Sequence, residues 1–274
     1  MSTSNSKTLS THDLSLSIAG KIICQHLNIQ FRAGEFWAIM GINGVGKTTL
    51  LHSLMGLKDI DHGSVQLNNK PIQHYSRRHL AHEIGLMLQE YEYYFPSTVL
   101  EATLIGRHPF INHWQWESQH DQQLAYQALD NVGLASLSER MINSLSGGEK
   151  RRLNLATLLT QNPNYYLLDE PVNHLDIKAQ LDILSLLKRQ FKQTQTAQNS
   201  KAGRCGIMVI HDPNLAYRFC DHILLLFDDG HYLSGSSQDI LNSENLSQLY
   251  HCPIEQVSSH SQTLFVPTLA ETES

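Results

Sequence analysis

A glycine-rich segment at residues 41–48, with the sequence Gly-Ile-Asn-Gly-Val-Gly-Lys-Thr, leaves this chain few possible folds. It matches the pattern G-x-x-x-x-G-K-[ST], in which glycines let backbone N–H groups converge on an anion. An apolar run at 36–40 precedes it, and a helical pattern at 49–57 follows it. A strand, a loop and a helix in this order favour phosphate binding, because the helix N-terminus also attracts anions. The segment therefore predicts an α/β fold with a phosphate site at the end of a strand.

Two side chains of this segment suit a nucleoside triphosphate that carries Mg²⁺. Lys47 supplies a positive charge for the β and γ phosphates. Thr48 offers a hydroxyl oxygen, which is a ligand type that Mg²⁺ prefers. We expect the nucleotide to be bound by Gly41, Asn43, Gly44, Gly46, Lys47, Thr48 and Thr49.

Another apolar run, at 165–168, ends in the carboxylates Asp169 and Glu170. In a parallel sheet this ending places both side chains at the carboxyl edge, where ligands bind. Asp169 can hold Mg²⁺ there, directly or through water. Glu170 is positioned to orient or deprotonate a water molecule aimed at the γ-phosphate. The pair predicts a hydrolytic site with Glu170 as its base.

A second anion site is indicated by Ser146, Gly147 and Gly148, which stand before a helical pattern at 149–160. Ser146 is a favourable N-cap residue. The two glycines expose the unpaired N–H groups of the helix N-terminus, which carries a positive partial charge.

The remaining hydrophobic pattern indicates alternating strands and helices. Continuous apolar runs at 36–40, 165–168 and 207–210 are typical of parallel strands covered on both faces. The segments 14–18 and 27–31 alternate apolar and polar residues, which predicts an antiparallel pair. Helical patterns occur at 49–57, 121–132, 149–160 and 177–191.

Charge and cysteine content exclude several classes of protein. Lys and Arg total 20 against 26 Asp and Glu, and the net charge of −6 provides no overall attraction to nucleic acid. The four cysteines form no C-x-x-C pair, which argues against a disulfide framework or a zinc site. No apolar run approaches the roughly 20 residues that span a bilayer, so we expect the chain itself not to cross a membrane.

Six motifs in one order give residues 9–240 a resemblance to the ATP-binding cassette family, the ATPase subunits of ABC transporters. They are the Walker A loop at 41–48, the Q-loop glutamine Gln89, the signature loop at 145–149, the Walker B pair Asp169 and Glu170, the D-loop at Leu175 and Asp176, and the switch histidine His211. The resemblance implies an ATPase with ATP and Mg²⁺ as cofactors.

The resemblance also implies a fold and a set of roles. The fold is a P-loop NTPase core with a parallel sheet, an antiparallel β subdomain and an inserted helical subdomain. It divides the chain into a nucleotide-binding domain at 1–240, with the helical subdomain at about 91–160, and a C-terminal extension at 241–274. The implied catalytic residues are Glu170, His211 and Gln89, the implied Mg²⁺ ligands are Thr48, Gln89 and Asp169, and the implied further nucleotide contacts are Ser146, Gly147, Gly148 and Asp176.

In this family two cassettes face head to tail, and each ATP lies between one Walker A loop and the opposite signature loop. One chain that carries both half-sites can satisfy them in a two-fold homodimer. The membrane subunit docks in this family on the helical block next to the Q-loop. We therefore expect a peripheral homodimer at the cytoplasmic face of the inner (plasma) membrane, in contact with permease subunits, served indirectly by a substrate-binding protein, and without nucleic acid.

Shorter signals resemble the importers of ferric siderophores, haem and cobalamin. They are residues 106–110, 211–215 and 218–222, together with the tail at 249–253 and 264–267, which is similar to the C-terminal strand pair of that branch. We expect the chain to power the uptake of a metal chelate through a separate permease.

Two departures from the family pattern and two local segments leave alternatives open for the function of the chain. Ile18 stands where the family usually has an aromatic residue that stacks on adenine, and Glu149 replaces the usual signature glutamine, with Lys150 and Arg151 available to offset its charge. A weakly active cassette that binds ATP as a regulatory module is therefore one alternative. Residues 173–176 resemble translation-associated cassettes, which generally carry two cassettes in one chain where this chain has one, and a soluble assembly or translation factor without a membrane partner is a second alternative. The aromatic segment 91–95 is either loop packing or a surface for a membrane partner, and we prefer the partner.

Overall fold

The structure is a computed structural model, and it describes residues 7–89, 96–112, 115–192, 203–259 and 262–268. The main sheet has the strand order β10-β9-β3-β8-β7-β6. All neighbours are parallel except β10, which pairs antiparallel with β9 at one edge. Its strands are β3 (Phe36–Met40), β6 (Ile84–Met87), β7 (Tyr165–Asp169), β8 (Cys205–Val209), β9 (His222–Leu226) and β10 (Tyr232–Ser236).

The three continuous apolar runs form the centre of this sheet, as the sequence predicts. Every residue of β3, β7 and β8 is buried, because helices cover one face and a second sheet covers the other. Alternate residues of each strand therefore enter two different hydrophobic clusters. In β3, Phe36 and Ala38 belong to the cluster on the helical side, whereas Trp37 and Ile39 belong to the cluster beneath the second sheet.

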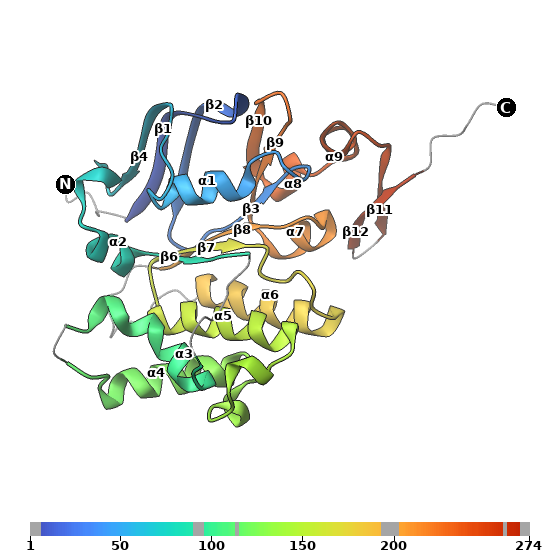
Figure 1. Cartoon of the computed structure of the whole chain (residues 1–274). Coiled ribbons are helices and arrows are strands. Elements are labelled where there is room, and N and C mark those ends of the chain that lie inside the picture. The colour runs from blue at the N-terminus through green and yellow to red at the C-terminus, as the bar shows by residue number, and fades with distance from the viewer. Residues whose placement is uncertain (1–6, 90–95, 113–114, 193–202, 260–261, 269–274) are drawn as a thin grey trace, which may run out of the picture.

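The second sheet is antiparallel, with the strand order β2-β1-β4-β5. Its strands are β1 (Thr8–Ile18), β2 (Lys21–Arg32), β4 (His62–Leu67) and β5 (Lys70–Pro71). The predicted pair at 14–18 and 27–31 is confirmed, and Leu14 lies opposite Leu27. Helix α1 (Lys47–Leu54) packs between the two sheets, and α2 (Arg77–Glu83) lies beside β6 (Figure 1).

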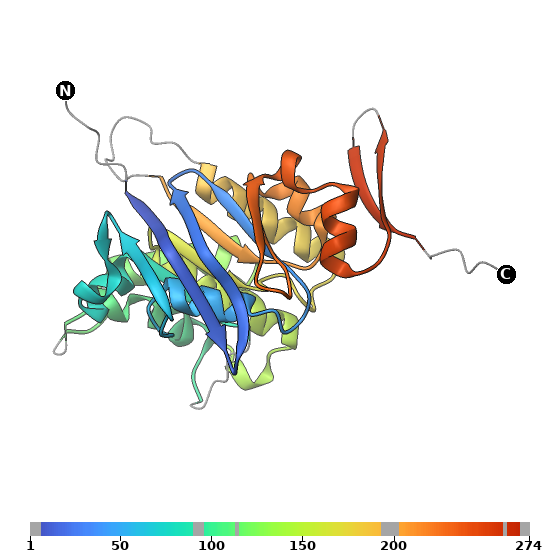
Figure 2. The same cartoon turned by 90° about the horizontal axis from the view of Figure 1, so that it is seen from above.

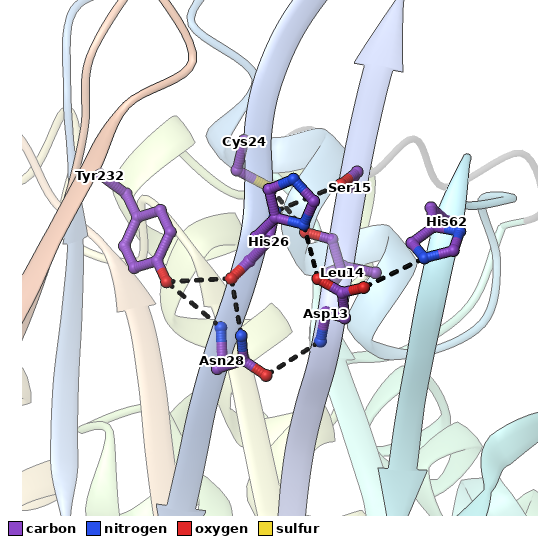
Figure 3. A network of polar contacts seen from close by, with 8 residues as sticks. All are labelled: Asp13, Leu14, Ser15, Cys24, His26, Asn28, His62 and Tyr232. Atoms are coloured by element: carbon purple, nitrogen blue, oxygen red, sulfur yellow. Dashed lines mark hydrogen bonds and ion pairs between the residues drawn. The ribbon is translucent and has the colours of Figure 1, made fainter.

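A polar network on the antiparallel sheet fixes an irregular part of β1. Asp13 has a left-handed backbone conformation, and its carboxylate lies 2.6 Å from Nδ1 of His26 and 3.0 Å from Nε2 of His62 (Figure 3). The Tyr232 hydroxyl donates to the carbonyl of His26 at 3.1 Å. A side chain of β10 thereby ties the antiparallel sheet to the edge of the main sheet.

Helices cover the opposite face of the main sheet (Figure 1). They are α3 (Val99–Leu104), a 3₁₀ helix (Ile105–Phe110), α4 (Gln119–Asn131), α5 (Gly147–Gln161) and α6 (Ile177–Lys192). The helices predicted at 121–132, 149–160 and 177–191 agree with α4, α5 and α6 to within two residues. Each of α4 and α5 begins at a serine that caps the first turn, which sets their first residues.

The segment 106–110 anchors this helical part. Arg107 is buried, and its Nε donates to a carboxylate oxygen of Asp121 in α4 at 2.7 Å. Its guanidinium also donates to the carbonyl of Thr160 in α5 at 3.2 Å, and it covers the ring of Phe110 at 4.0 Å. One side chain thus joins the 3₁₀ helix to two neighbouring helices.

The C-terminal region contains α7 (Pro213–Phe219), α8 (Ser237–Ile240), α9 (Ser243–Tyr250), β11 (Ile254–Ser259) and β12 (Gln262–Pro267). Figure 2 shows the pair β11 and β12 projecting beyond α9. The predicted C-terminal strand pair is present, but residues 249–250 lie in α9 instead of a strand. The helix prevails there because Leu246 and Leu249, three residues apart, both enter the core. No helix in the described part of the chain combines the length and apolar character that a membrane span requires.

Candidate nucleotide site

The loop 41–48 connects β3 to α1, as the sequence predicts. Gly46 has φ 107° and stands at the N-cap position of α1. A Cβ atom there would lie 2.5 Å from the side chain of Ile23, so both backbone conformation and space require glycine. The Gly46 position brings no side-chain cap to the helix, which leaves the N–H groups of the first turn available for an anion.

Lys47 is almost completely buried at this loop, with 6% of its surface exposed. Its Nζ donates to the carbonyls of Gly41 and Ile42, each at 2.9 Å. Burial lowers the pKa of Lys47, and the carboxylates of Glu170 and Asp169 act in the opposite direction. The ammonium group is therefore fixed by the loop carbonyls and lies in the field of the carboxylates at the end of β7.

Asp169 ends β7, and its side chain is fully buried. Neither carboxylate oxygen accepts a hydrogen bond of normal geometry from any residue that the structure describes. Burial raises the pKa of Asp169, and the nearby Thr48 hydroxyl partly offsets this effect. Two unpartnered carboxylate oxygens beside a hydroxyl are the hard oxygen donors that Mg²⁺ prefers. The residues present therefore fit a divalent cation at this position.

Glu170 follows in a left-handed backbone conformation with φ 51°, which is uncommon for a residue other than glycine. Its Oε1 lies 2.7 Å from Nε2 of His211, and its Oε2 accepts a hydrogen bond from Nε2 of Gln89 at 2.9 Å. Nδ2 of Asn173 also donates to Oε2. The structure thus gathers three of the predicted residues, Gln89, Glu170 and His211, and adds the amide of Asn173, which the sequence motifs do not predict.

Arg151 in α5 contacts main-chain carbonyls, whereas the sequence suggests that it offsets the charge of Glu149. Its guanidinium donates to the carbonyls of Gln89, Asp169 and Glu170, the Asp169 bond being 3.0 Å long. It therefore does not offset the charge of Glu149; the cations that lower the pKa of Glu149 are Arg140 and Arg152, after the hydrogen bonds from Ser146. No sequence pattern marked Arg151, because its partners are main-chain atoms of two distant segments.

The signature loop caps its own helix. Ser146 Oγ accepts a hydrogen bond from the Glu149 N–H, and Oε2 of Glu149 accepts bonds from the N–H and hydroxyl of Ser146 at 2.8 Å each. A cavity of about 330 Å³ adjoins this loop and is lined by Ser146, Gly148, Glu149, Arg152, His174, Leu175, Asp176, Lys178, Ala179 and Asp182. Within the described residues, the loop 41–48 contributes nothing to this lining, so the cavity lies apart from that loop.

Known proteins resemble this chain both in sequence and in fold. Residues 24–173 match the ABC transporter family. The chain belongs to the ABC transporter family. The petrobactin import ATP-binding protein FpuD of Bacillus anthracis is 32% identical over 95% of this chain and 93% of its own length. The ferric enterobactin transport ATP-binding protein FepC of Escherichia coli (strain K12) is 32% identical over 86% of this chain and 84% of its own length.

A solved metal-chelate type ABC transporter in an inward-facing conformation has the same fold, with a TM-score of 0.81 and 32% identity over 97% of this chain and 99% of its own. The predicted P-loop NTPase fold and the predicted ABC-type ATPase are thereby confirmed. The individual roles of the site residues stay predictions. The aromatic segment 91–95, predicted to meet a membrane partner, lies outside the described residues.

Proposed function

We propose that this ABC-type ATPase powers the import of a metal chelate of the siderophore, haem or cobalamin type. The observation that carries the catalytic part is the Glu170 carboxylate, which is held by Gln89, Asn173 and His211 directly after the unpartnered carboxylate of Asp169. The cargo is supported by the relatives, whose names specify petrobactin import and ferric enterobactin transport.

In the proposed reaction the glycine loop and Lys47 bind the β and γ phosphates of ATP. Thr48, Asp169 and Gln89 would hold Mg²⁺, which would neutralise phosphate charge when bound. Glu170 orients a water molecule for attack on the γ-phosphate and accepts its proton. His211 contacts the other carboxylate oxygen of Glu170, and its proposed role is to sense the γ-phosphate. The contacts of Glu170 with Gln89 and His211 hold these three side chains together.

The two half-sites support a homodimer as the working form. Ser146, Gly147 and Gly148 start α5 at a position that the loop 41–48 of the same chain does not share. In a head-to-tail pair, the signature loop of one copy and Asp176 complete the nucleotide site of the other. Because ATP then contacts both copies, its binding favours the closed pair and its hydrolysis releases it.

The permease is proposed to dock on the helical part of the chain near Gln89. The main-chain carbonyl of Gln89 bonds to Arg151 in α5, while its side chain bonds to Glu170. A displacement of the helical part can therefore reach the catalytic glutamate through few contacts. On this proposal the protein lies peripherally at the cytoplasmic face of the membrane, and the substrate-binding protein acts only through the permease.

The experiment is ATP hydrolysis and binding by the purified protein. We expect Mg²⁺-dependent hydrolysis, and a loss of ATP affinity of about tenfold or more in Lys47→Ala, because a charge-assisted contact disappears. The exposed Lys58→Ala is the matched control. Affinity purification from the native membrane is expected to yield a polytopic membrane protein. Association with ribosomes and with no membrane protein would instead support the assembly or translation factor.

A further inference from the structure

The backbone of His211 is held by the C-terminal part of the chain. The hydroxyl of Tyr250, the last residue of α9, donates to the carbonyl of His211 at 3.0 Å. Burial raises the pKa of Tyr250, so the hydroxyl keeps its proton and remains a donor. His211 therefore contacts Glu170 through its ring and α9 through its carbonyl.

A second, independent contact holds the residues that follow His211. The side-chain amide of Asn214 in α7 pairs with the backbone of Phe265 in β12: it accepts from the Phe265 N–H at 2.7 Å and donates to the Phe265 carbonyl at 3.2 Å. The rings of Tyr217 and Phe265 meet edge to face, with centroids 5.6 Å apart. Both α9 and β12 thus attach to the segment that begins at His211.

Helix α9 and the strands β11 and β12 are themselves attached to the core of the protein. The hydrophobic cluster on the helical side of the main sheet includes Leu246 and Leu249 of α9, Ile254 of β11 and Phe265 of β12. The hydroxyl of Ser247 also accepts a hydrogen bond from the N–H of Ile254 at 2.8 Å. Tyr250 consequently extends from a helix that is packed into the core, and its bond to His211 restricts where the imidazole ring can lie.

We propose that Tyr250 is a positioning residue for ATP hydrolysis and acts through His211. The proposal rests on the proposed role of His211 at the γ-phosphate. A fixed carbonyl limits the backbone freedom of His211, so that its ring reaches Glu170 with a smaller loss of entropy. The C-terminal segment, which lies beyond the family match at 24–173, thereby sets the geometry of the catalytic glutamate.

Tyr250→Phe tests this role, because it removes the hydroxyl and keeps the ring. We expect kcat to fall about threefold to tenfold, because this is the effect of losing one hydrogen bond. The KM for ATP should stay unchanged. Hydrogen exchange of the backbone amides at 211–215, followed by mass spectrometry, is expected to accelerate. Tyr232→Phe is the matched control, because its hydroxyl also donates to a backbone carbonyl, that of His26, on the antiparallel sheet (Figure 3). We expect Tyr232→Phe to leave both kcat and the hydrogen exchange at 211–215 unchanged.

A double variant separates positioning from general stability. In a His211→Ala background, Tyr250→Phe is expected to cause no further loss of the residual hydrolysis, measured with radiolabelled ATP. A further loss of the same size as in the wild-type background would overturn the proposal. Unchanged hydrogen exchange at 211–215 in Tyr250→Phe would also overturn the positioning proposal, and this result can be obtained even from a protein without ATPase activity. If the wild-type protein does not hydrolyse ATP, that result by itself overturns only the proposed function.

Discussion

Nε2 of His211 lies 2.7 Å from Oε1 of Glu170, although 41 positions separate the two residues in sequence. They meet because β7 and β8 are parallel neighbours in which Asp169 pairs with Val209. Both strands consequently end at the same edge, where Glu170, directly after β7, and His211, two residues after β8, are neighbours in space. This register places a carboxylate and an imidazole together at the carboxyl edge of the main sheet.

Glu170→Gln is expected to abolish turnover while retaining ATP. The amide cannot accept a proton from water, so hydrolysis should fall about 10²- to 10⁴-fold. The shape of the side chain and the loop 41–48 are unchanged, and ATP affinity by equilibrium binding should be preserved. Glu139→Gln, at an exposed position, is the control. Hydrolysis at the wild-type rate by Glu170→Gln would remove the glutamate from its assigned role.

Arg151→Lys is expected to impair hydrolysis although it keeps the charge. A guanidinium can bond to the carbonyls of Gln89, Asp169 and Glu170 together, whereas a single ammonium group lacks the planar fork. We expect kcat to decrease about tenfold, the value of one lost charge-assisted bond, and the thermal midpoint to decrease as well. Arg189→Lys, on the exposed side of α6, should match the wild type. Equal kcat values in Arg151→Lys and the wild type would contradict the link.

The parts of this molecule that the sequence predicts are those in which residue type follows local geometry. Buried strands such as β3 and β7 require continuous apolar runs, and the Gly46 turn requires glycine. The sequence assigns Asp169 and Glu170 to the site because they stand at the end of an apolar run, where β7 ends. Each of these signals lies within a few neighbouring residues, so a single sequence contains it.

The contacts that the sequence does not predict join distant segments through main-chain atoms. Arg151 bonds to carbonyls, and Tyr250 bonds to the carbonyl of His211, so neither partner has a characteristic side chain. The sequence places Asn173 only in a segment that resembles other cassettes, although its position three residues after Glu170 is a usable signal for a local hydrogen bond. The irregular backbone at Asp13 also follows from tertiary contacts with His26 and His62.

The free energy of unfolding is expected to decrease at acidic pH because of Asp121. Burial acts to raise the pKa of this carboxyl, but hydrogen bonds from Ser118 and the guanidinium of Arg107 outweigh it and lower the pKa from 3.8 to about 2. Since the folded-state value is the lower one, the stabilisation is present above about pH 5 and is lost as the pH falls towards 2. Its size is about 2 kcal/mol.

Urea unfolding of the wild type and Asp121→Asn measures this contribution. The variant should be less stable near neutral pH, and the difference should shrink at about pH 3, where the wild-type carboxyl begins to lose its advantage. Asp130→Asn, an exposed position in the same helix, serves as the control. A difference between the wild type and Asp121→Asn that does not change with pH would show that the Arg107 pair is not responsible.

Ile18→Tyr is expected to tighten ATP binding. Ile18 ends β1 with 40% of its surface exposed and pairs with Lys21, whose Nζ donates to the carbonyl of Gly44 in the glycine loop at 3.4 Å. This chain of contacts places residue 18 beside the loop, where an aromatic ring can stack on adenine. Base stacking contributes about 1 to 3 kcal/mol, so calorimetry should show an affinity increase of about fivefold or more, and none in Leu57→Tyr. Equal affinities of the wild type and Ile18→Tyr would mean that the adenine lies elsewhere, and rapid wild-type turnover would remove the reason for considering a regulatory cassette.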